Sequence, residues 1–301
     1  MEVFQLRYNE GLFCTPHLRQ RGALIYPVSN CFIACDTPYN EAEWVIFGAP
    51  YDGTSSYRPG SRFAPDSIRA ASYGLETYSP AQDKDLEDVR ICDCGDVELS
   101  FGDKKRILAA IEEKAAGFVQ DGKKVIGVGG EHLVTLPLFM ASAGKLENPA
   151  LIHLDAHADL RDDYMGEKLS HATVVRRIAD VIGAENVFQY GIRSGTAEEF
   201  AYIRSNSTMK TPPEKLKSIL KDRPVYFTLD LDVLDPAFFP GTGTPEPGGW
   251  SFSELVGFFQ FISGLNVVGC DVVELSPHYD HSGVSSITAS KVLRELILKV
   301  F

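Results

Sequence analysis

Two apolar segments that end in closely spaced acidic side chains constrain this chain more than any other feature. Each segment indicates a buried strand, because its residues are apolar, β-branched or aromatic. The segments cover residues 151–154 and 225–229, and the polar residues that follow them include Asp155, His157, Asp159, Asp230 and Asp232. Residues two apart share one face of an extended chain, so each set should point the same way. Buried carboxylates repel one another unless protons or cations compensate them, and a pair of divalent cations is the simplest compensation.

Strand-like and helix-like segments alternate along almost the whole chain. Stretches such as 105–120 indicate helices, because their apolar side chains recur on one face. The segments expected to form strands are 44–48, 89–94, 124–128, 151–154, 187–191, 224–229 and 267–273. The segments expected to form helices are 65–73, 105–120, 171–182, 197–204, 215–221, a stretch that starts at Ser251, and 287–299. This alternation is typical of a mostly parallel sheet covered by helices on both faces.

We therefore predict a single domain over residues 1–301, with a three-layer α/β/α architecture. Residues 1–43 contain three prolines and show no clear periodicity, so we expect an N-terminal extension that wraps the surface. In open parallel sheets, ligands bind beyond the carboxyl ends of the strands. The polar residues at or just after such ends are His132, Asp155, His157, Asp159, Asp230, Asp232 and Glu274. We expect these residues to meet at one rim of the sheet.

The six candidate ligands, His132, His157 and the four aspartates, indicate the kind of metal site. They offer more oxygen than nitrogen and no thiolate, which suits manganese or magnesium better than structural zinc. Six ligands exceed what one metal takes when room is left for water, so two metals that share carboxylates fit better. Water held between two metals has a lowered pKa and becomes a nucleophile near neutral pH. The chemistry that follows is hydrolysis at an electrophilic carbon or phosphorus.

Net charge and cysteine content limit the partners and the cell compartment that we expect for this protein. The net charge of −12 over 301 residues disfavours nucleic acid and anionic membranes as partners and favours a cationic substrate. No signal pattern begins the chain and no apolar run is long enough to span a bilayer, so we expect a cytoplasmic protein. The six cysteines are expected to be reduced, mostly buried thiols.

Several motifs together resemble the ureohydrolase family, which includes arginase and agmatinase. The resemblance runs from about residue 44 to the end of the chain. Its motifs are Gly129-Gly130-Glu131-His132, Asp155-Ala156-His157-Ala158-Asp159, Ser170-His171, residues 230–236 and Asp271-Val272-Val273-Glu274. Within the family, the loop 57–63, the run 241–244 and the segment 279–282 are most similar to agmatinases.

This resemblance implies a site with two Mn²⁺ ions per subunit. One ion would be held by His132, Asp155, Asp159 and Asp230. The other would be held by His157, Asp155, Asp230 and Asp232, so that Asp155 and Asp230 bridge the pair. A bridging hydroxide would attack the guanidinium carbon of agmatine and give urea and putrescine. The resemblance also implies a homotrimer or homohexamer.

Three residues would carry the catalytic roles, and a fourth the substrate tail. Glu274 would pair with the guanidinium through charge-assisted contacts, and His171 would relay a proton to the leaving amine. Asp159 would serve as both ligand and catalytic residue. Asp163, in the loop 162–169, would attract the distal ammonium of agmatine, although a solvated surface loop is an equal alternative.

Two positions depart from the family pattern, and one histidine remains outside the predicted ligand set. Many relatives have Asp where this chain has Glu131, which would orient His132, and Thr where it has Ala158, which should point away from the metals. His153 is expected to be a satisfied core histidine. The alternatives that stay open are guanidinobutyrase or arginase activity, a zinc deacetylase with one metal, and an inactive homologue that binds partners.

Overall fold

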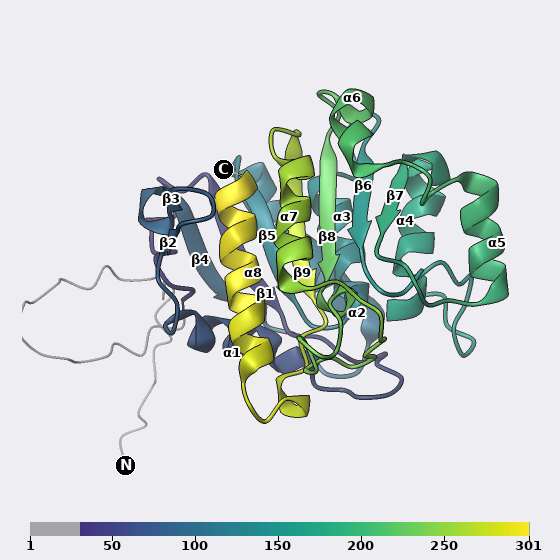
Figure 1. Cartoon of the computed structure of the whole chain (residues 1–301), viewed down its shortest axis with the longest axis horizontal. Coiled ribbons are helices and arrows are strands. Elements are labelled where there is room, and N and C mark those ends of the chain that lie inside the picture. The colour runs from purple at the N-terminus through teal and green to yellow at the C-terminus, as the bar shows by residue number, and fades with distance from the viewer. Residues whose placement is uncertain (1–30, 301) are drawn as a thin grey trace, which may run out of the picture.

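The computed structural model describes residues 31–300 and is built on a seven-stranded sheet in which all neighbouring strands run parallel (Figure 1). The strand order is β4-β1-β5-β9-β8-β6-β7. The bounds of these strands are Trp44–Ala49 for β1, Ile91–Asp96 for β4, Lys124–Gly129 for β5, Ala150–Leu154 for β6, Val187–Tyr190 for β7, Val225–Asp230 for β8 and Val267–Val273 for β9. A small antiparallel pair, β2 (Tyr78–Ser79) and β3 (Lys84–Asp85), was not predicted from the sequence.

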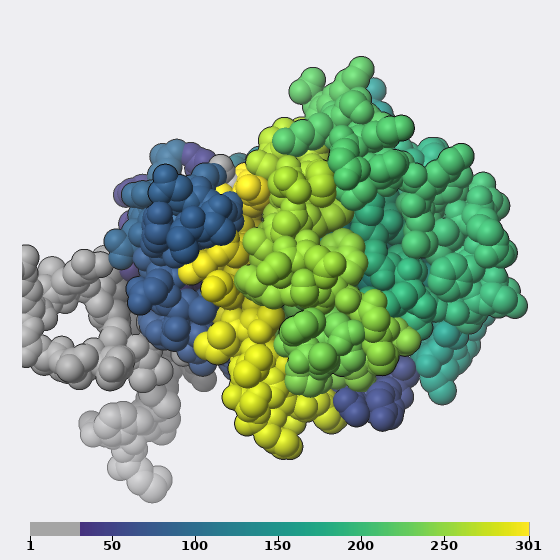
Figure 2. Space-filling model, in the orientation of Figure 1, coloured from purple at the N-terminus to yellow at the C-terminus, as the bar shows by residue number. Residues whose placement is uncertain are grey.

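Helices cover both faces of the sheet, which confirms the predicted three-layer architecture (Figure 1). On one face lie α1 (Ala64–Ser72), α7 (Phe252–Ile262) and α8 (Val284–Val300), with the short α6 (Leu216–Leu220) against α7. On the other face lie α2 (Lys104–Gln120), α3 (Thr135–Ser142) and α4 (Val174–Ile182), and α5 (Ala197–Asn206) follows β7. In Figure 2 the yellow-green and yellow C-terminal segments run between the blue early segments and the green middle of the chain.

The central strands are apolar along their whole length because both of their faces are covered. Every residue of β6 and of β8 is buried. Side chains that alternate along a strand enter two different cores: Ile152 packs with the α7 and α8 layer, and Leu151 packs with the α2 and α3 layer. Because both faces are buried, polar side chains inside these strands are unusual. Those that occur contact the residues of the site described below.

The predicted start of the helix after Trp250 is confirmed by its cap. Ser251 Oγ accepts a hydrogen bond from the Glu254 amide at 3.3 Å, and Glu254 Oε2 accepts one from the Ser251 amide at 2.8 Å. The two bonds satisfy amide groups that a helix end leaves without an intrahelical partner. The same reciprocal pair, Thr196 and Glu199, begins α5.

The described part of the predicted N-terminal extension, residues 31–43, is exposed at several positions and enters the core at others. Phe32 and Cys35 are buried in the core, and Asp36 forms a bridge to Cys92 of β4. The remainder of the predicted extension, residues 1–30, lies outside the described residues. The expectation that all cysteines are reduced is wrong for Cys31, which is disulfide-bonded. The other four described cysteines are free thiols.

Across residues 31–300, no helix is both long enough and apolar enough to cross a bilayer.

A buried guanidinium joins α1 to the edge strand β4. Arg69 donates to Asp93 from Nε at 2.8 Å and from Nη2 at 3.0 Å, and to Asp96 from Nη1 at 2.5 Å. Asp93 also accepts from the Phe32 amide at 2.7 Å. One carboxylate therefore holds the helix and the incoming chain together at the same point.

Replacing Arg69 by Met should lower the free energy of unfolding by about 3–5 kcal/mol, because it leaves the buried Asp93 carboxylate without its partner. Urea unfolding followed by circular dichroism would measure the loss. Arg90→Met is the matched control, since Arg90 and Glu43 form a pair in which both side chains are more than half exposed. Its loss should stay below about 1 kcal/mol. Equal losses in the two variants would contradict a structural role for the Arg69 network.

Candidate functional site

The predicted ligands and Glu274 follow the carboxyl ends of the four adjacent central strands, β5, β9, β8 and β6. His132 follows β5, Glu274 follows β9, and the group 155–159 follows β6. Asp230 ends β8, and Asp232 comes two residues later. Because these strands are parallel, their carboxyl ends lie at one edge of the sheet, and the structure brings these side chains together there.

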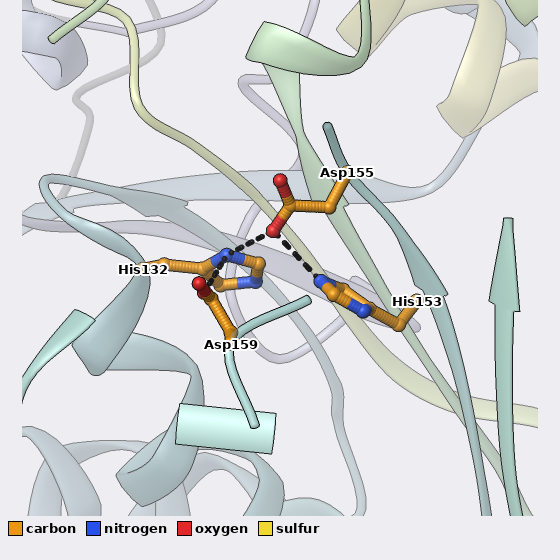
Figure 3. A group of neighbouring side chains, drawn as sticks. All are labelled: His132, His153, Asp155 and Asp159. Carbon is orange, nitrogen blue, oxygen red and sulfur yellow. Dashed lines mark hydrogen bonds and ion pairs between the residues drawn. The ribbon is translucent and has the colours of Figure 1, made fainter. Parts of the chain in front are cut away.

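Three carboxylates surround one buried imidazole nitrogen. His132 Nδ1 lies 3.0 Å from Asp155 Oδ2, 3.1 Å from Asp159 Oδ2 and 3.2 Å from Asp230 Oδ2. Figure 3 shows the His132 ring between Asp155 and Asp159, with His153 on the other side of Asp155. Although it is buried, Nδ1 has no hydrogen bond of acceptable geometry to any residue within 31–300. A nitrogen and three oxygens that converge without such a bond form an arrangement that suits a metal ion.

A chain of hydrogen bonds beneath the site determines which His132 nitrogen carries the proton. Thr228 Oγ1 donates to Asp271 Oδ1 at 2.6 Å, and Tyr226 donates to the other oxygen of Asp271 at 2.7 Å. The single Thr228 hydroxyl proton is thereby used, so its oxygen can only accept from His132 Nε2, at 3.0 Å. His132 therefore carries its proton on Nε2 and keeps the Nδ1 lone pair for the carboxylate cluster.

A second group adjoins the first through Asp155. His157 Nδ1 lies 2.9 Å from Asp232 Oδ2 and 3.6 Å from Asp155 Oδ1. Backbone amides fix both carboxylates: His157 N donates to Asp155 at 2.6 Å, and Ala156 N donates to Asp232 at 3.0 Å. Burial, together with the charges of Asp232 and Asp155, raises the pKa of Asp230 well above its ordinary value. Carboxylates this close to one another need positive charge nearby.

His153 is satisfied within the core, as expected, but it also holds a predicted bridging ligand. Gln189 Nε2 donates to His153 Nδ1 at 3.1 Å and to the Ala158 carbonyl at 2.9 Å, while Gln189 Oε1 accepts from Thr208. His153 must therefore carry its proton on Nε2, which donates to Asp155 Oδ2 at 2.8 Å. With a proton on that nitrogen, His153 orients Asp155 and is not a ligand itself.

The segment 155–159 reaches the site as a loop, so the predicted extended conformation is wrong there. Strand β6 ends at Leu154, and Asp159 has a left-handed backbone with φ of 52°. Within the segment 155–159, two amides bond to the Asp155 and Asp232 side chains, and two bond to the Tyr190 and Ser194 carbonyls. Ala158, which was expected to point away, is among the residues that line the cavity.

A cavity of about 260 Å³ lies over these ligands. It brings together most of the predicted ligands with Glu274 and His171. Lining residues that the sequence analysis missed include Ser56, Arg161, Ser194, Glu199 and Thr244, whereas Tyr164 belongs to the loop 162–169 that was expected at the substrate tail. Asp163 does not line the cavity; it is exposed, and its side chain accepts from the Gly166 amide at 3.2 Å. The structure gives no support to a substrate contact at Asp163.

The position of Glu274 is set by the backbone beside it. Glu274 has a left-handed φ of 67°, and its amide donates to the Gly130 carbonyl at 2.9 Å. Its Oε1 accepts from the His132 amide at 2.8 Å. The carboxylate is thereby held beside the first ligand group, at the wall of the cavity.

The expected role of Glu131 in orienting His132 is wrong. Glu131 accepts hydrogen bonds from Thr54 and Ser55, whereas the ring of His132 is held by Thr228. Burial raises the pKa of Glu131 to about 7, although the hydrogen bonds from Thr54 and Ser55 oppose this shift. The sequence offered a signal for Thr228 and His153, because each lies two residues before a ligand in a buried strand and so shares its face. It offered none for Thr54.

The chain matches the model of the arginase family over residues 42–299. The chain belongs to the arginase family. It is 49% identical to the agmatinase of Bacillus anthracis over 275 residues, which cover 89% of this chain and 95% of the relative. A structure from Clostridium difficile, assigned provisionally as an agmatinase, has a TM-score of 0.83 and 48% identity and covers 87% of this chain and 98% of its own. The structure of the agmatine ureohydrolase of Thermoplasma volcanium has a TM-score of 0.78 and 35% identity, and the match covers 90% of this chain and 94% of that one.

These relationships make the protein a hydrolase that acts on amidino carbon–nitrogen bonds. The residues present also fit a binuclear metal centre. His132, Asp155 and Asp159 lie within ligand distance of one another, and so do Asp155, His157 and Asp232. The two groups share Asp155, and the fixed tautomer of His132 leaves a lone pair aimed at the first.

Replacing Thr228 by Val should weaken metal binding about 10–100-fold, because His132 loses the partner that fixes its proton on Nε2. Metal titration by calorimetry would measure the change. Thr228→Ser keeps the hydroxyl and should bind metal nearly as well as the unchanged protein. Equal affinities for the Val and Ser variants would show that the Thr228 hydroxyl does not control His132.

Proposed function

We propose that the protein is an agmatinase that holds two Mn²⁺ ions and hydrolyses agmatine to urea and putrescine. The observation that carries this proposal is the meeting of two ligand groups, Glu274 and His171 in one cavity. Relatives that are 47–49% identical and named agmatinase support the substrate. The oxygen-rich ligand set supports manganese over a structural zinc ion.

In this proposal, His132, Asp155, Asp159 and Asp230 hold one ion, and His157, Asp155, Asp230 and Asp232 hold the other. When bound, the ions would lower the pKa of a water molecule and supply a hydroxide near neutral pH. Asp155 is well suited to be shared, because His153 holds its Oδ2 and the His157 amide holds its Oδ1.

Glu274 would bind the guanidinium. Its carboxylate lines the cavity beside the ligands and keeps one oxygen on the His132 amide. A guanidinium and a carboxylate form charge-assisted, often bidentate hydrogen bonds that fix the plane of the substrate. Such a contact would present the central carbon of the guanidinium toward the ligand groups.

His171 would carry the proton to the leaving amine. It lines the same cavity, and the ring of Tyr164 packs edge-on against it with 5.5 Å between centroids. Burial is the largest cause that lowers the pKa of His171 below its ordinary value. The resting ring is therefore neutral and able to accept a proton before passing it on.

Arg161 favours a second candidate with an anionic tail on the guanidine, such as 4-guanidinobutyrate or arginine. Arg161 lines the cavity and stacks over Tyr164 at 4.8 Å. Its charge would attract a carboxylate, whereas Glu199, 3.6 Å away, partly offsets it. Agmatine remains the proposed substrate, because the buried and acidic floor of the cavity and the named relatives support it.

Replacing Glu274 by Gln should lower kcat/KM for agmatine by a factor on the order of 10²–10³, because the substituted amide lacks the charge that binds the guanidinium. The Gln oxygen can still accept from the His132 amide, so two metals per subunit should remain. Urea release and metal content measured on the same sample test both statements. Near-normal turnover would remove Glu274 from the site.

The decisive test compares urea release from agmatine, arginine and 4-guanidinobutyrate, with a chelated sample as control. We expect a preference for agmatine that chelation abolishes. Arg161→Gln should leave KM for agmatine unchanged or lower it, since a positive charge is removed from the cavity wall. A preference for an anionic guanidine, with KM raised by Arg161→Gln, would establish the second candidate. No urea from any of the three would overturn both candidates.

The cytoplasmic location and the homotrimer or homohexamer stay predictions. Light scattering from the purified protein would measure the subunit number directly.

A further inference from the structure

We propose that Thr54 and Glu131 are positioning residues that fix the proton of His171 on Nδ1 and thereby keep the Nε2 lone pair free toward the cavity. The inference deepens the proposed function and rests on it for the role of His171. The hydrogen-bond geometry that carries it is independent of the substrate. Neither Thr54 nor Glu131 lines the cavity, so both would act through His171.

The first step is the buried carboxylate of Glu131, which is surrounded by donors. Thr54 donates to it twice, from its amide at 2.8 Å and from its hydroxyl at 2.5 Å. Ser55 Oγ lies 3.3 Å from Oε2. The side chain is fully buried, so water does not compete for these bonds. Three donors thus converge on the two Glu131 oxygens, and both oxygens act as acceptors.

The second step follows from the single proton of the Thr54 hydroxyl. Because Thr54 donates that proton to Glu131, its oxygen can only accept from other groups. Two nitrogens of His171 approach this oxygen: the amide at 3.1 Å and ring Nδ1 at 3.3 Å. Both must therefore donate, which places a proton on Nδ1. A neutral imidazole has one ring proton, so Nε2 is left with a free lone pair.

The third step is the direction in which Nε2 points. Ser56 Oγ lies 3.4 Å from His171 Nε2, and Ser56 lines the cavity. With the proton on Nδ1, Nε2 accepts a hydrogen bond from the Ser56 hydroxyl, so it faces the cavity where substrate would bind. A proton accepted at Nε2 can leave from Nε2 to the departing amine, and the ring then returns to its starting tautomer. A proton placed on Nε2 in the resting state would block the acceptance step.

The same chemical device occurs at the metal ligand His132. There a buried carboxylate, Asp271, takes the hydroxyl proton of Thr228, which accepts from the imidazole. At His132 the chain leaves Nδ1 free, and at His171 the corresponding chain leaves Nε2 free. Two carboxylate–threonine–histidine chains thus prepare two imidazoles for different tasks.

Nitrogen-15 NMR of the full chain, labelled on histidine and loaded with diamagnetic Mg²⁺, tests the tautomer directly. His171→Asn identifies the His171 signals by their loss. We expect a protonated Nδ1 and an unprotonated Nε2 in the unchanged protein. Thr54→Val should move the proton to Nε2 in a large part of the molecules, and Thr54→Ser should restore the original pattern. A proton found on Nε2 in the unchanged protein would overturn the proposal without any variant.

Glu131→Gln provides a second test that keeps the shape of the side chain. The Gln side chain replaces one accepting oxygen by an NH2 donor, and with its remaining oxygen kept on the Thr54 amide this NH2 would face Thr54 Oγ1. The Thr54 hydroxyl would then accept from the amide, and its own proton would be free to point toward His171 Nδ1. The Nε2-protonated form should therefore increase in this variant as well. An unchanged tautomer in both Thr54→Val and Glu131→Gln would overturn the proposal.

Kinetics separate this inference from the proposed function. Thr54→Val should lower kcat for agmatine by a factor on the order of 10², the contribution of a positioned proton carrier, with KM within about twofold and two metals retained. Thr54→Ser should recover most of kcat. Active unchanged enzyme together with an unaltered kcat in Thr54→Val would overturn the positioning role. Absence of urea from the unchanged enzyme would instead overturn the proposed function, while the NMR result would still decide the tautomer.

Discussion

The mutual repulsion of four buried carboxylates is the constraint on which the rest of this structure depends. Asp155, Asp159, Asp230 and Asp232 come from two parallel strands and meet where those strands end. Apolar strands covered on both faces deliver them into a region with little water, where their charges are costly. Imidazoles and backbone amides compensate part of the negative charge of these carboxylates. The ligand geometry suits bound cations, which would compensate the rest. The sheet thus supplies rigidity at the point where electrostatic cost is greatest.

Two threonine hydroxyl groups determine which nitrogen of each of two imidazoles in the site carries the proton. A hydroxyl has one proton, so a buried carboxylate that accepts this proton also decides what the hydroxyl oxygen can do. Thr228 on β8 and Thr54 in the loop after β1 both follow this rule, with Asp271 and Glu131 as the acceptors. Each imidazole then has one nitrogen whose role is determined by residues that never touch substrate. The electrostatics of the site are therefore built outward from the core.

Much of this site follows from the sequence, because strand periodicity and parallel topology place His132, Asp155, Asp230 and Glu274 at one rim. The capped start of α7 was also predicted, because Ser251 and Glu254 have the spacing of a reciprocal helix cap. Contacts between irregular segments could not be predicted. Thr54 meets Glu131 and His171 across 77 and 117 residues of chain, and no periodicity links loops. The expected contact of Glu131 with His132 failed because adjacent residues after a strand need not point to the same place.

Gly130 brings the turn before His132 against the loop that contains Thr54. A Cβ atom at this position would lie 1.9 Å from the Tyr51 carbonyl oxygen, so the turn before His132 presses directly on the loop that contains Thr54. The Glu131 amide donates to that same carbonyl at 2.7 Å. The turn that carries the metal ligand His132 and the loop that carries Thr54 are therefore in direct backbone contact. Replacing the 51–56 loop by that of a relative would therefore change metal affinity and proton transfer together.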